Sequence, residues 1–300
     1  MRLLDRLLTE RFKVGLADRD EVLSLLKNAQ LVVADNVADY YMDEKGKDVP
    51  RPSDFPNVML PFEYTFIEMR WRKRDKVPSV LEESGVLFSL MPAKELQVKD
   101  SVGVQLTGAE TKWHMHGYLF VKYQGKDPFL MNRFIIGVGE DGRVADDTGG
   151  GQIGFAVMIL QEELKGFSPE ETRRLSGALI TTTLMPSLLA LSFMHCRNVK
   201  VKTEIPPAPL SKKHQRKTGR PLLRYHVLQI DHMKQVLERE GGASTQGLKK
   251  ALHICRGHFK HYGRDGKGLL FGKYTATVWI PMHARGSAEE GVVMKDYDVK

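Results

Sequence analysis

Residues 61–71 read PFEYTFIEMRW, and the composition of this stretch is typical of a β-strand. The aromatic side chains of Phe62, Tyr64 and Phe66 fall at alternate positions, which is the period of a β-strand whose two faces differ. Three later stretches have a similar strand-forming composition: 85–91 (GVLFSLM), 112–123 (KWHMHGYLFVKY) and 132–139 (NRFIIGVG). Four successive segments of this kind predict one antiparallel sheet.

Helical patterns stand before and after this predicted sheet. Leucines recur at helical spacing at the start of the chain, and apolar residues continue that spacing over 19–41. After the strands, a serine N-cap, a proline at the first helical position and an acid in a capping box (SPEE, 168–171) predict a helix that runs to about Phe193. Its near-uniform apolarity predicts a buried helix packed on the sheet, so the expected fold class is α+β.

Several sequence features argue against membrane insertion, secretion and a bound cofactor. The charge-free stretch between Arg174 and Arg197 contains many Thr, Ser, Gly and Pro residues, so it predicts a core helix rather than a membrane span. The chain has two cysteines, Cys196 and Cys255, and its first residues carry charge where a secretory leader is apolar. The glycine run 149–154 has neither spacing of a phosphate-binding loop. A cytoplasmic protein that uses no cofactor is therefore expected.

Positive charge is concentrated in the last third of the chain. The net charge is +8, and residues 211–300 contain 18 Lys and Arg against 8 Asp and Glu, whereas the first 210 residues contain 27 against 29. At the start of this basic part, 205–221 reads IPPAPLSKKHQRKTGRP, which predicts an extended linker with a basic loop. The expected organisation is an α+β core domain over 1–205, a proline-rich basic linker over 206–221 and a basic, mostly-β module over 222–300.

Five segments of the C-terminal module are rich in strand-forming residues: 222–230, 251–262, 268–274, 276–286 and 291–299. The alternation of a strand puts Arg256 beside His258 on one face. It likewise puts His283 beside Arg285 on one face of a later segment. If the two segments pair with matching faces, one cleft holds a histidine pair, two arginines and a lysine from the segment between: His258, His283, Arg256, Arg285 and Lys273.

This set of residues matches the needs of a metal-independent ribonuclease. His258 and His283 are the candidate catalytic pair, because imidazole accepts and donates protons near neutral pH. Arginine and lysine side chains bind phosphate and stabilise the charge that develops in the transition state. The candidate phosphate-binding residues are the cations of the predicted cleft and of the basic linker: Arg256, Arg285, Lys273, Lys212, Lys213, Arg216 and Lys217.

Three other interpretations fit the same residues. The first is a structural role, in which the His and Arg side chains are hydrogen-bonded parts of the sheet. The second is nucleic-acid binding without cleavage. The third is a metal site on His253, Cys255 and His258, which strand alternation disfavours because His258 falls on the other face. A further pair, His114 and His116, shares a strand face but lacks a third ligand, so no metal is predicted there.

The C-terminal pattern of RGHFKHY, LLFGKY, VWIPMHARGS and VVMKDYDV resembles uncharacterised proteins of bacterial mobile elements and phages. The resemblance is confined to these C-terminal residues and carries no known activity. It implies a microbial or phage origin and assigns no site residue.

The leading hypothesis is a nucleic-acid-binding protein of bacterial or phage origin, with ribonuclease activity as its sharper form. RNA is expected ahead of DNA, because the histidine chemistry uses a 2′-hydroxyl. The alternative is a non-enzymatic interaction, inhibitor or assembly protein from a phage, whose basic module binds an acidic protein. The sequence does not assign an oligomeric state.

Overall fold

The computed structural model describes residues 1–9, 12, 19–43, 55–71, 81–93, 111–145, 155–159, 183–230, 251–255, 258–263, 275–280, 283–285 and 287–292. Their contacts form two compact units, residues 1–194 with 201–228 and residues 195–200 with 229–300. No helix within the described ranges has the length and apolarity needed to cross a lipid bilayer.

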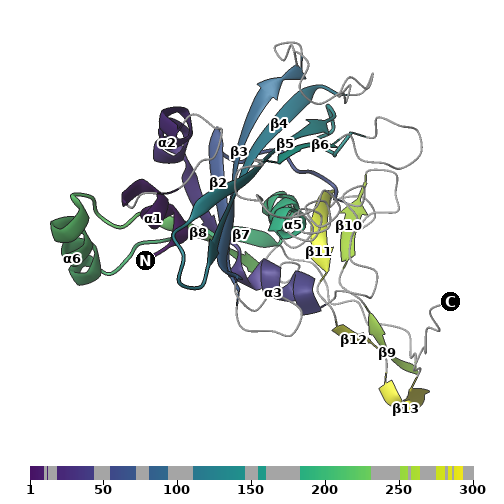
Figure 1. Cartoon of the computed structure of the whole chain (residues 1–300). Helices are drawn as coiled ribbons and strands as arrows, with labels where there is room; N and C mark the ends of the chain where they lie inside the picture. Colours follow the sequence, from purple (N-terminus) through teal and green to yellow (C-terminus); the bar gives the residue numbers. More distant parts are fainter. Residues whose placement is uncertain are drawn as a thin grey trace, which may run out of the picture. The chain divides into compact units, whose positions relative to one another are not determined.

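A mixed sheet of eight strands is the largest element of the fold (Figure 1). In spatial order its strands are β6 (Phe155–Ile159), β5 (Phe129–Val138), β4 (Trp113–Tyr123), β3 (Leu81–Pro92), β2 (Tyr64–Arg70), β1 (Gln30–Val33), β8 (Tyr225–Ile230) and β7 (Val199–Glu204). The ladders from β2 to β6 are antiparallel. The predicted antiparallel sheet is therefore confirmed, and so is the α+β fold class.

β1 is the main departure from the predicted sheet. It falls inside the stretch 19–41 that the sequence predicts to be helical, and it pairs in parallel with both β2 and β8. Leu31, Val32 and Val33 are all buried. The strand has no polar face, so its short apolar run fits the helical period equally well. The β-branched valines favour the extended backbone once neighbouring strands are present.

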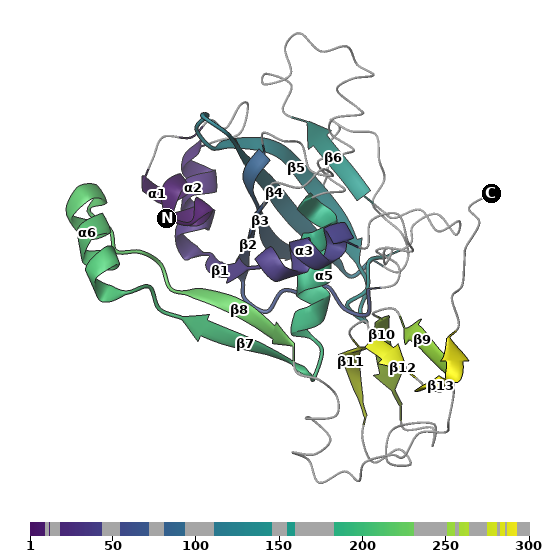
Figure 2. The same ribbon diagram turned by 90° about the horizontal axis from the view of Figure 1, so that it is seen from below.

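Four of the described helices pack on the sheet: α1 (Leu3–Thr9), α2 (Arg19–Asn28), α3 (Asp35–Asp43) and α5 (Met185–Met194). α1 and α2 cover one face, where their leucines meet Phe66 and Phe120 in one apolar core. α3 and α5 lie on the opposite face (Figures 1 and 2). The predicted buried helix is confirmed for α5, whose residues from Pro186 to Phe193 are all buried. Its predicted start at Ser168 lies outside the described residues.

Two glycines let aromatic rings lie directly on the sheet. Gly117 of β4 is paired with Phe134 of β5, and a Cβ atom at residue 117 would stand 1.8 Å from the Phe134 Cζ. In the same way, a Cβ atom on Gly85 of β3 would stand 2.5 Å from the Phe66 ring. A side chain at either position must displace a buried ring.

Ion pairs and a hydrogen bond fasten the start of the chain to β2 and to the first residue of α3. Arg2 lies 3.5 Å from the Glu68 carboxylate and 3.3 Å from Asp35. The Leu4 N–H donates to Glu68 at 3.1 Å. Glu68 is 1% exposed. Burial raises the pKa of its carboxyl group to about 7, although the Leu4 N–H and Arg2 both act in the opposite direction.

Replacing Glu68 by glutamine should make the free energy of unfolding less dependent on pH. The folded-state pKa is raised from 4.5 to about 7, so the folded protein binds more protons than the unfolded chain in that window, and wild-type stability falls as pH rises through it. Relative to wild type, Glu68→Gln should gain about 3 kcal/mol between about pH 4.5 and pH 8. Urea unfolding followed by circular dichroism measures this difference, and a difference that stays constant with pH would contradict it.

The prediction that residues 206–221 form an extended linker is wrong. Residues Ala208–Thr218 form helix α6, which connects β7 to β8. β8 lies in the segment 222–230 that the sequence assigns to the C-terminal module, yet it pairs with β1 in the large sheet. Residues 201–228 therefore belong to the first unit, and the chain leaves that unit after residue 228. The sequence suggests a linker because prolines followed by cations are typical of linker composition. The place of β8 in the large sheet is not evident from its own sequence, because β8 pairs with β1, which is distant along the chain.

The described part of the second unit is mostly β, with five short strands: β9 (Ala251–Cys255), β10 (His258–Tyr262), β11 (Ala276–Ile280), β12 (His283–Arg285) and β13 (Ser287–Val292). β10 pairs with β11 and β9 with β12, both antiparallel, while β13 pairs with β9 in parallel.

The Asn198 side chain makes two hydrogen bonds, of 2.6 and 2.8 Å, to the backbone of buried Trp279. Burial raises the pKa of the Cys196 thiol to about 12, so this thiol stays protonated and unreactive.

Candidate nucleic-acid interface

β7, α6 and β8 form a feature that we call the basic arm, residues 201–228 (Figure 2). β7 and β8 are neighbours in the sheet, and α6 stands at the end of this two-stranded ribbon. The sequence explains the local structure. Pro206 and Pro207 end the strand ladder, and a further proline stands in the first turn of α6. Gly219 ends the helix with a φ of 78°, and its N–H donates to the Gln215 carbonyl at 2.8 Å.

The inner face of α6 is a polar stripe. Ser211, His214 and Thr218 are partly buried, whereas the other residues of the helix are exposed. The three positions fall on one side of the helix at helical spacing. The Ser211 hydroxyl accepts the Leu222 N–H at 3.1 Å, and the Thr218 hydroxyl donates to the His214 carbonyl at 2.9 Å. The returning chain is thus bonded to α6, which holds the helix in place although it buries no apolar face.

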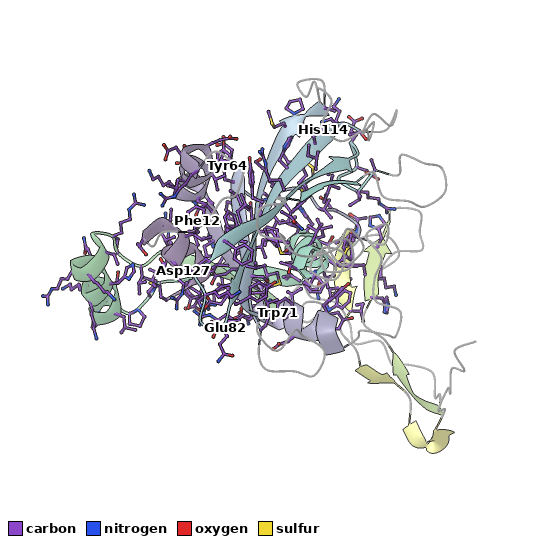
Figure 3. All side chains as sticks on the ribbon, in the orientation of Figure 1. Phe12, Tyr64, Trp71, Glu82, His114 and Asp127 are labelled. Carbon is purple, nitrogen blue, oxygen red and sulfur yellow. The ribbon has the colours of Figure 1, made fainter. Side chains whose placement is uncertain are left out.

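The outer side of α6 carries the four phosphate-binding residues predicted for this segment, which we call the cation face: Lys212, Lys213, Arg216 and Lys217. All four are exposed. At about 100° per residue they span an arc of about 140°, which lies away from the polar stripe. None of the four forms an ion pair with a described residue. Figure 3 shows nitrogen-tipped side chains standing out from α6.

The basic arm holds most of the net charge of the protein. Residues 201–228 contain seven Lys and Arg and a single acid, Glu204, which amounts to +6 of the total +8. Glu204 is paired with Lys202 at 2.6 Å, so it does not neutralise the cation face. The rest of the chain is close to neutral. Charge concentrated in this way raises the local potential and attracts polyanions.

A small pocket lies at the base of the arm. It has a volume of about 260 Å³, and its lining includes Lys27, His214 and Arg220 together with Asp5 and Leu223. The Asp5 carboxylate is buried and accepts the Leu223 N–H at 3.1 Å, which fastens the returning chain to α1. Lys27 and Arg220 therefore add two cations where the arm joins the helices.

The candidate catalytic histidines occupy two different ladders. His258 of β10 is exposed and paired with Ile280, whereas His283 of β12 is paired with Cys255. The ladder of β10 with β11 and the ladder of β12 with β9 belong to separate sheets. The pairing therefore does not make His258 and His283 cross-strand partners.

The other members of the predicted cleft add no support for it. Arg285 of β12 is paired with His253, and Arg256 and Lys273 lie outside the described residues. The ribonuclease cleft stays a prediction.

The described residues include no group of three His, Cys, Asp or Glu side chains that would hold a metal ion. His114 and His116 lie near the start of β4, where Figure 3 labels the first of them. Burial, together with the neighbouring His114 and Arg133, lowers the pKa of His116 to about 4. His116 is therefore uncharged at neutral pH.

The sequence contains a signal for α6 that the linker interpretation overlooked. The cations recur in pairs four residues apart, Lys212 with Arg216 and Lys213 with Lys217, which is a helical spacing. Prolines precede these pairs and Gly219 follows them, the asymmetry that marks a helix start and stop.

No family model, curated protein or solved structure matches the chain. The resemblance to proteins of mobile elements and phages stays a prediction.

Proposed function

We propose that the protein binds nucleic acid through the cation face of the basic arm. The observation that carries this proposal is the set of four exposed cations on one side of α6, none of which has an ion-pair partner among the described residues. Long cationic side chains that are not neutralised within the protein are available to replace the counterions around phosphates. Binding by such replacement gains free energy chiefly from counterion release.

The density of charge on α6 matches that of a nucleic-acid backbone. The cation face extends over five residue steps, which is about 7.5 Å of helix axis. With both strands counted, a DNA duplex has one charge per about 1.7 Å of its axis, so about four phosphates of the two strands lie along the same length. Protein surfaces intersperse carboxylates with cations and neutral side chains, and they offer fewer anions over that distance. This comparison favours nucleic acid over the acidic protein partner.

The cation face offers phosphate contacts, which carry no sequence information. Asn and Gln read adenine, and the one such amide on α6, Gln215, lies outside the cationic arc, whereas Arg and Lys contact guanine. We therefore expect little sequence preference beyond one for guanine. The sequence suggests a preference for RNA over DNA only if His258 and His283 act together as a catalytic pair. The proposal covers both nucleic acids and does not require cleavage.

Fluorescence anisotropy with a labelled duplex of about 20 base pairs, and with single-stranded RNA of equal length, tests the proposal. The association constant for the duplex should fall with salt concentration, with a log–log slope of about −3 to −4, because each neutralised phosphate contributes about −0.9. Failure to bind either nucleic acid at about 50 mM salt would overturn the proposal. Tight binding of polyglutamate instead would support the acidic-protein alternative.

A further inference from the structure

A run of exposed apolar residues lies beside the cation face. Residues 205–210 read IPPAPL, and five of the six are exposed. Ile205 is 80% exposed and Leu210 is 56% exposed. Exposed large apolar side chains are few among the described residues, namely Met1, Met91, Val201, Ile205 and Leu210. Three of these five belong to the basic arm. Consecutive exposed apolar residues next to a charged surface indicate an interaction site.

This apolar run is held in a fixed conformation. Pro206, Pro207 and Pro209 restrict the backbone, and Pro207 has φ −54° and ψ 131°. The Ser211 N–H donates to the Pro207 carbonyl at 3.0 Å, which joins the run to the first turn of α6. Ile205 and Leu210 are therefore presented at the two ends of a stiff turn, and little conformational entropy is lost when they become buried.

We propose that Ile205 and Leu210 form an apolar wedge that enters a base step of duplex DNA from the minor groove and bends the duplex. This inference rests on the proposed function. Proteins that bend DNA in this way insert Ile, Leu or Pro between base pairs, and adjacent cations hold the phosphates on either side. The basic arm has both parts in sequence, because the apolar run leads directly into the cation face.

The position of the apolar residues argues against a membrane as the partner. A helix that lies on a bilayer has an apolar face along its whole length. In α6, Leu210 is followed by polar residues, Ser211 to Thr218, so apolar side chains gather at one end of the helix. Such an arrangement suits insertion of a tip into a narrow site more than contact with a flat apolar layer.

A duplex of about 30 base pairs with a donor and an acceptor dye at its ends tests the wedge by energy transfer. The wild-type protein should bring the ends closer. It should also bind a duplex with a central two-nucleotide gap about tenfold more tightly than the intact duplex, because the gap has already removed the stacking that the wedge must break.

The double variant Ile205→Ala, Leu210→Ala should lose both effects and keep its affinity for the intact duplex within about threefold. The matched control Val201→Ala, which removes an exposed apolar side chain outside the run, should keep both effects.

Binding without a change in energy transfer, or with equal affinity for gapped and intact DNA, would overturn the wedge and leave the proposed function standing. Absence of any binding would instead remove the proposed function and the wedge together. Binding of phosphatidylglycerol vesicles that depends on Ile205 and Leu210, with no bending of DNA, would assign the apolar run to a membrane and also overturn the wedge. Thermal unfolding of both variants should match wild type, because the altered side chains are exposed.

Discussion

Reversing the charge of the cation face should reduce the affinity for a DNA duplex by about a thousandfold at low salt. The variant carries four substitutions: Lys212→Glu, Lys213→Glu, Arg216→Glu and Lys217→Glu. Each cation–phosphate contact contributes on the order of 1 kcal/mol, and four of them correspond to a factor of about a thousand in the dissociation constant. The log–log salt slope should become shallower by about 3 to 4, because four counterions are no longer released. Anisotropy titrations at several salt concentrations measure both quantities.

A control variant separates the cation face from net charge alone. It carries the same number of reversals at exposed cations of the first unit outside the arm: Arg19→Glu, Lys112→Glu, Lys126→Glu and Arg143→Glu. Both variants change the net charge equally, yet the control should lose no more than about tenfold in affinity, since long-range repulsion is screened by salt. The cation face makes no described ion pair, so its reversal should leave the thermal midpoint near that of wild type. Equal losses in the two variants would show that α6 has no special role.

Gly117→Ala should destabilise the first unit by about 3 kcal/mol or more. The new Cβ atom would lie 1.8 Å from the Phe134 Cζ, whereas carbon atoms in contact are about 3.5 to 4.0 Å apart. The Phe134 ring is buried and packs edge-to-face on Phe88 with centroids 5.9 Å apart, so a shift of the ring disturbs this core contact. The strands β4 and β5 must separate or the ring must leave the core. Urea unfolding of the purified variant measures the loss.

Two further variants identify the cause of that loss. Gly125→Ala places a methyl group where no atom lies within 4 Å, at a residue with φ 71°, so it should be destabilised by the backbone strain alone, about 1 to 2 kcal/mol. Adding Phe134→Leu to Gly117→Ala makes room for the new methyl group and should recover part of the stability. If the double variant is no more stable than Gly117→Ala, the clash with the ring is not the reason for the loss.

The strands β2 to β5 could be predicted because their signals are local. Strand-forming residues gather in segments such as 61–71 and 132–139, and polar or turn-forming residues separate these segments. β1 could not be predicted in the same way. It has four residues, it is buried on both faces, and its partners are distant along the chain, with Leu31 paired to Phe66 and Val32 to His226. A parallel pairing over such a distance leaves no periodic pattern in the strand itself.

The residue types of the candidate interface could be predicted, but their setting could not. Lysine and arginine attract phosphate whatever structure holds them, so Lys212 and Arg216 were identifiable from the sequence alone. That they lie on a helix depends on contacts with the returning chain, such as the hydrogen bond from the Leu222 N–H to Ser211. The expected meeting of His258 and His283 depends on a strand register, and a register is fixed by the whole ladder rather than by any one segment.

The pairing of β1 with β8 also sets an order of events during synthesis. A ribosome adds about 5 to 20 residues per second, so β1 waits roughly ten to forty seconds for β8 after β1 itself has been made. Until then, the side of β1 that will receive β8 is an open apolar edge, at which nascent chains associate. β7 and α6 are made just before β8, and β8 completes the two-stranded ribbon that carries α6. The sheet and the arm are therefore finished in the same step, and a chain arrested between residues 205 and 225 has neither.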